Sequence, residues 1–109
     1  MSTTSATWQR DESGVVTVTL KQADRPVVVL DSALLESLDT ALEEIGDDPS
    51  GFVLRSEARV FVAGANLEEI MSLDDTALDR YLRNGSRVFG RIASLPCPTV
   101  AAINGATLG

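Results

Sequence analysis

The stretch Val60–Ile70 combines small residues with a predicted change of secondary structure, so its backbone amides could bind a ligand or stabilise a charge. An apolar extended segment leads into Ala63-Gly64-Ala65, and a helix is expected to begin near Leu67. Small side chains leave the main chain open to close approach by a ligand. The first amides of a helix are unpaired donors at the positive end of its dipole. This corner could therefore hold an anion or a developing oxyanion, although a tight strand-to-helix turn needs the same residue types for packing alone.

A second loop of small residues closes the printed sequence. Residues 99–103 are predicted to form a buried strand, Asn104-Gly105 leaves it as a turn, and Gly109 is the last residue. A β-turn at Asn104-Gly105 is the simplest explanation of this pattern. The sequence ends inside a loop and not after a capped element, so we expect this loop to be unfinished.

Periodic segments along the chain predict the elements that must position these loops. Asp31 and Ser32 are suitable N-cap residues, and Gly46 is a suitable helix end. Leu34, Leu38, Leu42 and Ile45 recur at helical spacing between them. The predicted elements are a strand at 15–20 with a hairpin partner near 7–10, a helix at 34–45, a strand at 51–56, a helix at 76–93 and a strand at 99–103.

Strands and helices alternate in this order, which predicts an α/β fold with parallel strand pairing and no division into two domains. The helix at 76–93 carries its larger apolar residues on one face. Gly85 lies on the same face, which indicates close packing against a neighbour. The apolar residues of that face are Leu78, Leu82, Phe89 and Ile92.

Composition excludes several function classes. The chain has 109 residues, a net charge of −7 and no histidine. The acidic charge argues against nucleic-acid binding, and the lack of histidine excludes Ser-His-Asp triads and histidine-based metal sites within this chain. No apolar run could span a membrane and the first residues do not resemble a secretory signal, so we expect a cytoplasmic protein. Cys97 is expected to be a small buried residue.

Other polar and aromatic residues have ordinary structural explanations. Glu68 and Glu69 lie next to the small-residue corner, but acidic residues are common in the first turn of a helix, where we expect them to face solvent. Trp8 and Tyr81 are isolated aromatic residues and are expected to pack. Four arginines at spacings of three and four predict a solvated basic face on the later helix, with an intersubunit or phosphate contact as the alternative. They are Arg80, Arg83, Arg87 and Arg91.

The two loops together resemble the paired motifs of the crotonase superfamily, also called the enoyl-CoA hydratase/isomerase family. The first motif reads Phe61-Val62-Ala63-Gly64-Ala65-Asn66-Leu67. The second reads Pro98-Thr99-Val100-Ala101-Ala102-Ile103-Asn104-Gly105-Ala106-Thr107-Leu108-Gly109. The resemblance covers nearly the whole chain. It implies the N-terminal portion of a crotonase-type ββα spiral core, so that residues 1–109 would be an incomplete acyl-CoA-binding domain.

The resemblance also implies a site for a coenzyme A thioester, with the coenzyme as part of the substrate and no permanently bound cofactor. Two backbone amides would polarise the thioester carbonyl, and the first would be that of Ala65. The carbonyl of Ala63 would accept from the adenine amino group, with Leu67 against the cofactor. The other residues implied to line the substrate are Arg25, Val27, Gly64, Asn66 and Gly109.

The implied activity is addition of water to a trans-2-enoyl-CoA by a trimeric or hexameric enzyme. Asn66 stands where the family usually has aspartate, and Val28 replaces a common asparagine. The second amide would follow Gly109, and the acid/base glutamates of hydratases would lie later still. The alternatives are therefore another reaction of the family, such as isomerisation, hydrolysis or decarboxylation, or a non-catalytic binding or oligomerisation piece.

Overall fold

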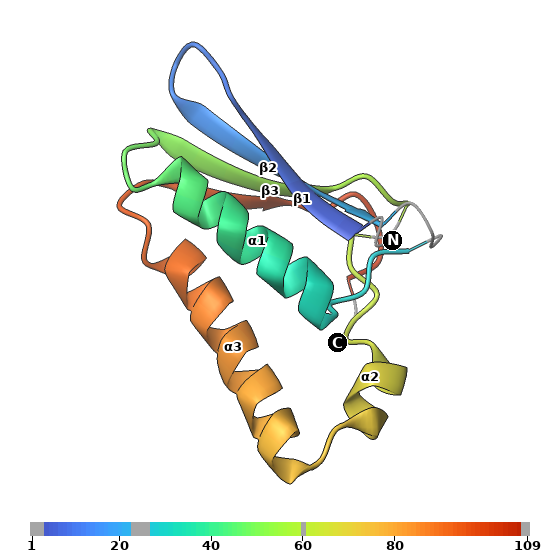
Figure 1. The fold of residues 1–109 in the computed structure, drawn as a ribbon. Helices are drawn as coiled ribbons and strands as arrows, with labels where there is room; N and C mark the ends of the chain where they lie inside the picture. The colour runs from blue at the N-terminus through green and yellow to red at the C-terminus, as the bar shows by residue number, and fades with distance from the viewer. Residues whose placement is uncertain (1–3, 23–26, 60, 108–109) are drawn as a thin grey trace.

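The computed structural model describes residues 4–22, 27–59 and 61–107 as a sheet with helices on one face (Figure 1). The α/β fold class and the predicted order of elements are confirmed. The strands are β1 Thr4–Arg10, β2 Val15–Gln22, β3 Gly51–Ser56 and β4 Thr99–Ala102. The helices are α1 Ser32–Ile45, α2 Leu67–Ser72 and α3 Asp75–Ala93.

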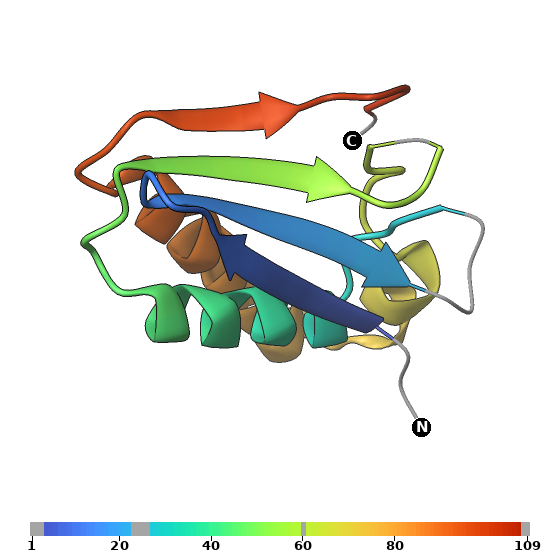
Figure 2. The same cartoon turned by 90° about the horizontal axis from the view of Figure 1, so that it is seen from above.

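The sheet has the strand order β1-β2-β3-β4 (Figure 2). The predicted hairpin is confirmed, since β1 and β2 pair antiparallel, while β2–β3 and β3–β4 pair parallel. In the hairpin turn the Asp11 carboxylate accepts from Ser13 N–H at 2.9 Å and from Val15 N–H at 3.0 Å. Parallel pairs need crossover connections, and these are nearly always right-handed. The two crossovers, β2 to β3 and β3 to β4, move across the sheet in the same direction, so α1 and α3 lie on the same face.

The core lies between β2, β3 and α1. Asp31 caps α1 by accepting from Leu34 N–H at 2.8 Å, and Gly46 ends the helix with a φ of 73°. Burial of a leucine side chain contributes about 2 kcal/mol, so the predicted apolar stripe is the main attachment of α1 to the sheet. The buried residues of α1 are Leu34, Leu35, Leu38, Ala41, Leu42 and Ile45.

The predicted apolar face of α3 is only partly buried. Val88 is the buried residue of this helix, whereas Leu82 is 56% exposed. The first half of α3 lies away from the sheet in Figure 1, which explains why that face is not buried along its whole length. Gly85 does face α1, but a Cβ there would lie 3.8 Å from Leu35 Cδ1, an ordinary contact. Neither α3 nor the other helices of the described ranges are long and apolar enough to cross a bilayer.

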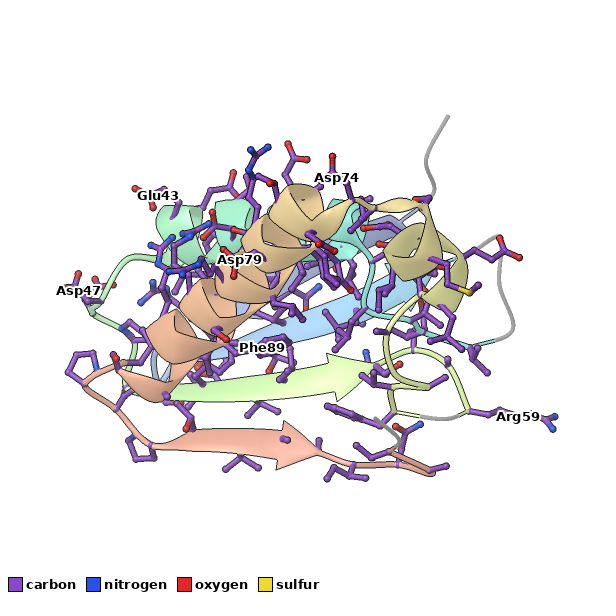
Figure 3. The ribbon with its side chains drawn as sticks, turned by 90° about the horizontal axis from the view of Figure 1, so that it is seen from below. Glu43, Asp47, Arg59, Asp74, Asp79 and Phe89 are labelled. Carbon is purple, nitrogen blue, oxygen red and sulfur yellow. The ribbon has the colours of Figure 1, made fainter. Side chains whose placement is uncertain are left out.

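The prediction that residues 99–103 are buried was wrong. Every residue of β4 is exposed, and Val100 and Ile103 are 58% and 59% exposed. In Figure 3, α1 and α3 lie over β1 to β3, and β4 lies beyond them at the edge of the sheet. Periodicity predicts an extended apolar segment but not whether another segment covers it. Cys97, which precedes β4, is half-buried, whereas full burial was expected.

Part of the predicted basic face of α3 is not simply solvated. Arg87 makes a two-bond pair with the Asp39 carboxylate of α1, at 3.2 and 2.9 Å. Arg91 reaches Asp39 at 2.7 Å and Glu43 at 2.9 Å. The hydrogen bond from Arg87 is the first cause that lowers the pKa of Asp39, and Arg91 acts in the same direction. These pairs join α1 to α3, while Arg83 pairs within α3 with Asp79.

Candidate functional site

The corner predicted from small residues is held by a neighbouring extended segment, residues 28–30. Ala63 N–H donates to the Val28 carbonyl at 2.7 Å, and Leu30 N–H donates to the Gly64 carbonyl at 2.8 Å. Leu30 and Ala65 form a parallel β-bridge. Gly64 has a φ of 104°, in the region that side chains disfavour. The glycine is therefore required by the backbone conformation of the corner and not only by packing.

The structure also brings the second predicted motif to the first. Phe61 N–H donates to the Ala106 carbonyl at 2.9 Å, and Val62 forms a parallel bridge with Thr107. The Asn104 side chain donates to the Ala58 carbonyl at 2.7 Å. The loop after β4 therefore lies beside the chain that leads into the corner, as paired motifs of one site would require.

Ala65 carries the donor that the corner leaves available. Its residue is exposed, and within the described part of the chain no hydrogen bond uses its N–H. The Gly64 carbonyl and the Ala65 N–H belong to one planar peptide group and point in opposite directions. Because Leu30 holds the Gly64 oxygen, the Ala65 N–H is directed away from Leu30. A carbonyl oxygen on that side could accept this hydrogen bond.

Helix α2 follows the corner directly and is attached by polar contacts. The Asn66 side chain caps it by accepting from Glu69 N–H at 3.2 Å. None of the residues of α2 is buried, and Leu67 and Met71 are 70% and 85% exposed. Leu67 thus presents an apolar side chain to solvent immediately beside the corner.

Glu69 does not face solvent freely, and that prediction was wrong for this residue. Its carboxylate accepts from Ser32 N–H at 3.2 Å and also bonds the Ser32 hydroxyl. Ser32 is the first residue of α1, where a negative charge is favoured by the helix dipole. Glu68 is exposed, as expected. Of the two neighbouring glutamates, Glu69 therefore has a structural partner that ties α2 to α1.

Two polar residues that support the corner were not predicted. The Tyr81 hydroxyl donates to the Leu30 carbonyl at 2.6 Å, so this aromatic does more than pack. Burial, followed by the charges of Glu69 and Asp31, raises the pKa of Tyr81. Gln22 is 5% exposed and bonds the backbone of Val29. The alternation of β2 could have revealed Gln22, because it occupies the same face as the buried apolar residues of that strand.

A shallow hollow of about 290 Å³ lies between the starts of α1 and α3. Tyr81 and Ser32 line it, and these residues bond Leu30 and Glu69 beside the corner. The remaining lining residues are Leu73, Ala77, Arg80 and Asn84.

The predicted site residues are placed as follows. Residues 63–67 form the corner and the start of α2, and Val27 is half-buried on the segment that leads to Val28. Arg25 and Gly109 lie outside the described residues. In the part of the chain that is described, no group of three or more His, Cys, Asp or Glu side chains could hold a metal ion.

The fold agrees with the comparison to known families. Residues 10–109 match the sequence model of the enoyl-CoA hydratase/isomerase family, and the chain belongs to that family. The fold is the N-terminal portion of the crotonase fold.

Solved structures of enoyl-CoA hydratases superpose on most of this chain. The enzyme from Bacillus anthracis is 26% identical with a TM-score of 0.78, and the match covers 92% of this chain and 40% of that one. The enzyme from Mycobacterium smegmatis is 27% identical with a TM-score of 0.80, covering 90% and 39%. A Pseudomonas aeruginosa protein is 31% identical with a TM-score of 0.75, covering 95% and 46%. The chain thus spans less than half the length of these structures.

Proposed function

We propose that this protein binds acyl-CoA thioesters and that it serves the addition of water to a trans-2-enoyl-CoA. The observation that carries the proposal is the N–H of the exposed residue Ala65, which has no acceptor among the described residues and is oriented by the Leu30–Gly64 hydrogen bond. Membership of the enoyl-CoA hydratase/isomerase family supports a thioester as the ligand.

The proposed chemistry uses the backbone as an electrostatic catalyst. The thioester oxygen accepts the Ala65 N–H while water attacks the β-carbon of the enoyl group. The electron pair of the double bond moves toward the carbonyl, whose oxygen becomes an enolate oxygen. The attacking water loses one proton as its oxygen bonds the β-carbon, and the α-carbon gains one proton, so that the product carries the elements of one water molecule. An oriented N–H is stronger toward the enolate than toward the carbonyl, and one such donor is worth about 3 kcal/mol of the barrier.

The remaining predicted residues would bind the coenzyme. In this proposal the Ala63 carbonyl accepts from the adenine amino group, and the exposed Leu67 side chain contacts the adenine. We assign Arg25 and Val27 to the entrance for the coenzyme and count Gly109 among the residues that line the substrate, although Arg25 and Gly109 lie outside the described residues. Gly64 and Asn66 border the thioester, with the Asn66 side chain holding the start of α2.

Binding without turnover is the second candidate function. The state of the two neighbouring glutamates favours it: among the described residues, Glu69 is bound to Ser32, and Glu68 is exposed. The other reactions of the family share the polarised thioester, so the corner does not distinguish them from hydration.

Calorimetric binding of crotonyl-CoA and of S-butyl-CoA tests the proposal, because the thioether lacks the carbonyl oxygen. A hydrogen bond from Ala65 predicts about tenfold tighter binding of the thioester. Equal affinities, or no binding of either compound, would contradict the proposal. Loss of the enoyl absorbance on incubation then separates the candidates: hydration predicts it, and binding without turnover predicts none.

A further inference from the structure

Gln22 ends β2 with an amide side chain inside the protein. Its Nε2 donates to the Val29 carbonyl at 2.9 Å, and its Oε1 accepts from Val29 N–H at 2.7 Å. A weaker contact of 3.4 Å joins Nε2 to the Asp31 carboxylate. The side chain thus pairs with Val29 as a neighbouring strand would, using its donor and its acceptor on one residue. If the amide were reversed, Oε1 would face the Val29 carbonyl oxygen and Nε2 would face the Val29 N–H, so this orientation is required.

The donor and the acceptor of the Gln22 amide are each linked to the corner by a hydrogen-bonded peptide group of residues 28–30. The Val29 carbonyl shares a planar peptide with Leu30 N–H, which donates to the Gly64 carbonyl at 2.8 Å. The Gly64 carbonyl in turn shares a peptide with the Ala65 N–H. On the other side, Ala63 N–H donates to the Val28 carbonyl at 2.7 Å, and the peptide of that carbonyl donates to Gln22 through Val29 N–H.

We propose that Gln22 is a positioning residue for the Ala65 amide, acting through two peptide groups whose dipoles are aligned from Nε2 to the Ala65 N–H. This inference rests on the proposed function in one respect, namely that Ala65 donates to a thioester. Hydrogen bonds in series polarise one another, so the chain strengthens the terminal donor as well as orienting it. Gln22 is buried, and its hydrogen bonds in the described part of the chain go to Val29 and Asp31 and not to the corner, so we expect its effect to travel through residues 28–30.

Other groups near the segment do not replace this function. The Tyr81 hydroxyl bonds the Leu30 carbonyl, which belongs to the next peptide and not to either peptide of the chain. The Asp31 N–H also reaches the Val29 carbonyl, at 3.1 Å, but a contact between residues two apart cannot fix the segment relative to β2. Two backbone hydrogen bonds join the corner to residues 28–30, namely Ala63 to Val28 and Leu30 to Gly64. Among the described residues, Gln22 is therefore the side chain that connects the peptide groups of both bonds to the sheet.

The test uses nuclear magnetic resonance on the free protein and ligand binding on variants. In the wild type, couplings transmitted across hydrogen bonds are expected from Gln22 Nε2 to the Val29 carbonyl and from Leu30 N to the Gly64 carbonyl. In Gln22→Met the second coupling should weaken, and the residual dipolar coupling of the Ala65 N–H should change. Gln9→Met makes the same substitution at an exposed position of β1, and Val18→Ala removes core volume from β2 without touching the chain. Both controls should leave the Ala65 coupling unchanged.

The binding measurement shows whether the positioning matters for the ligand. The preference for crotonyl-CoA over S-butyl-CoA should fall about tenfold in Gln22→Met and remain in both controls. Gln22→Glu keeps the acceptor for Val29 N–H and loses the donor, so it should lose the preference as well. Absence of the Gln22–Val29 coupling in the wild type overturns the inference, even if Gln22→Met does not fold. So does a folded Gln22→Met with an unchanged Ala65 dipolar coupling. If the wild type shows no preference for the thioester, the proposed function fails, and the couplings in the free protein alone decide the inference about Gln22.

Discussion

At the scale of single residues, the chemistry of the corner depends on Gly64. Its φ of 104° turns the chain so that the Gly64 carbonyl meets Leu30 and the Ala65 N–H points away. A side chain at such a φ is strained, and the residue is buried, so the strain has little room to relax. Gly64 thus links the local backbone conformation to the donor that the proposed function uses.

Gly64→Ala should lower the free energy of unfolding by about 1–2 kcal/mol and should reduce the preference for crotonyl-CoA over S-butyl-CoA. Gly46→Ala is the matched control, because Gly46 also has a positive φ, 73°. It lies at the C-terminal end of α1, whereas Asp31 lies at the N-terminal end, beside the segment that holds the corner. This control should destabilise similarly and keep the preference. Urea unfolding and calorimetry measure the two effects. A Gly64→Ala variant with unchanged preference would show that the corner does not orient the ligand.

Residue types predicted the corner but not its supports. Small residues between an extended segment and a helix are a local pattern, and the structure has a turn there, with Gly64 at a positive φ and α2 beginning at Leu67. Glu69 was expected in solvent because acidic residues are common in the first turn of a helix. Its partner, Ser32, lies far away in the sequence, so no local pattern shows the contact. Tyr81 and Gln22 bond backbone atoms of residues 29 and 30, and no local pattern specifies such partners. Side-chain-to-backbone contacts of this kind depend on tertiary register, which the sequence alone does not reveal.

At the scale of elements, α1 and α3 face each other at Gly85 and are joined by the ion pairs of Asp39 and Glu43. Gly85 of α3 faces Leu35 of α1, and the space there accepts a methyl group. Helical periodicity predicted both helices, and Asp31 and Gly46 predicted the ends of α1, because caps and apolar stripes are local properties. It did not predict that Leu82 is exposed, because the depth at which a helix is buried depends on where the sheet ends.

Gly85→Ala should raise the free energy of unfolding by about 1 kcal/mol, because alanine loses less backbone entropy in a helix and its Cβ meets Leu35 at an ordinary distance. Gly90→Ala is the comparison, since a Cβ at Gly90 meets nothing within 4 Å and reports helix propensity alone. Denaturant unfolding gives both values. A loss of stability in Gly85→Ala, with a gain in Gly90→Ala, would mean that α1 and α3 approach more closely than described.

Asp39→Asn should lower the free energy of unfolding near neutral pH by about 1 kcal/mol, because it removes the shared partner of Arg87 and Arg91. The folded pKa of Asp39 is lowered, first by the hydrogen bond from Arg87. A lowered pKa contributes stability above the ordinary value of 3.8, and the contribution is lost as the pH falls below it through the folded pKa. The difference between wild type and variant should therefore shrink in acid.

Unfolding measured across that pH range checks the sign of the effect. Asp79→Asn is the control, because Asp79 pairs with Arg83 on the exposed surface of α3. Its effect should stay within about 0.5 kcal/mol at every pH. A difference for Asp39→Asn that grows in acid would contradict the assignment of the ion pairs.

At the scale of the whole molecule, helices cover one face of the sheet and leave β4 exposed at its edge (Figures 2 and 3). The alternation of strands and helices was sufficient to predict the α/β class and the parallel pairs, since crossover connections follow simple rules. The exposure of β4 could not be predicted, because coverage depends on what lies beside a strand and not on its own residues.

Amide hydrogen exchange should therefore differ sharply across the sheet. The amides of β2 and β3 should be the most protected, and those of β4 should exchange faster, because an exposed edge strand opens without unfolding the core. Exchange followed by mass spectrometry or nuclear magnetic resonance gives the order directly. Protection of β4 equal to that of β2 would mean that another surface covers this edge in solution.

Donation from the Ala65 N–H to a thioester oxygen would show in the Ala65 amide resonance of ¹⁵N-labelled protein. Addition of crotonyl-CoA should move the Ala65 proton downfield, and addition of S-butyl-CoA should not, although both should perturb residues that contact the coenzyme. An Ala65 amide proton that responds equally to both compounds, or to neither, would contradict the proposed hydrogen bond.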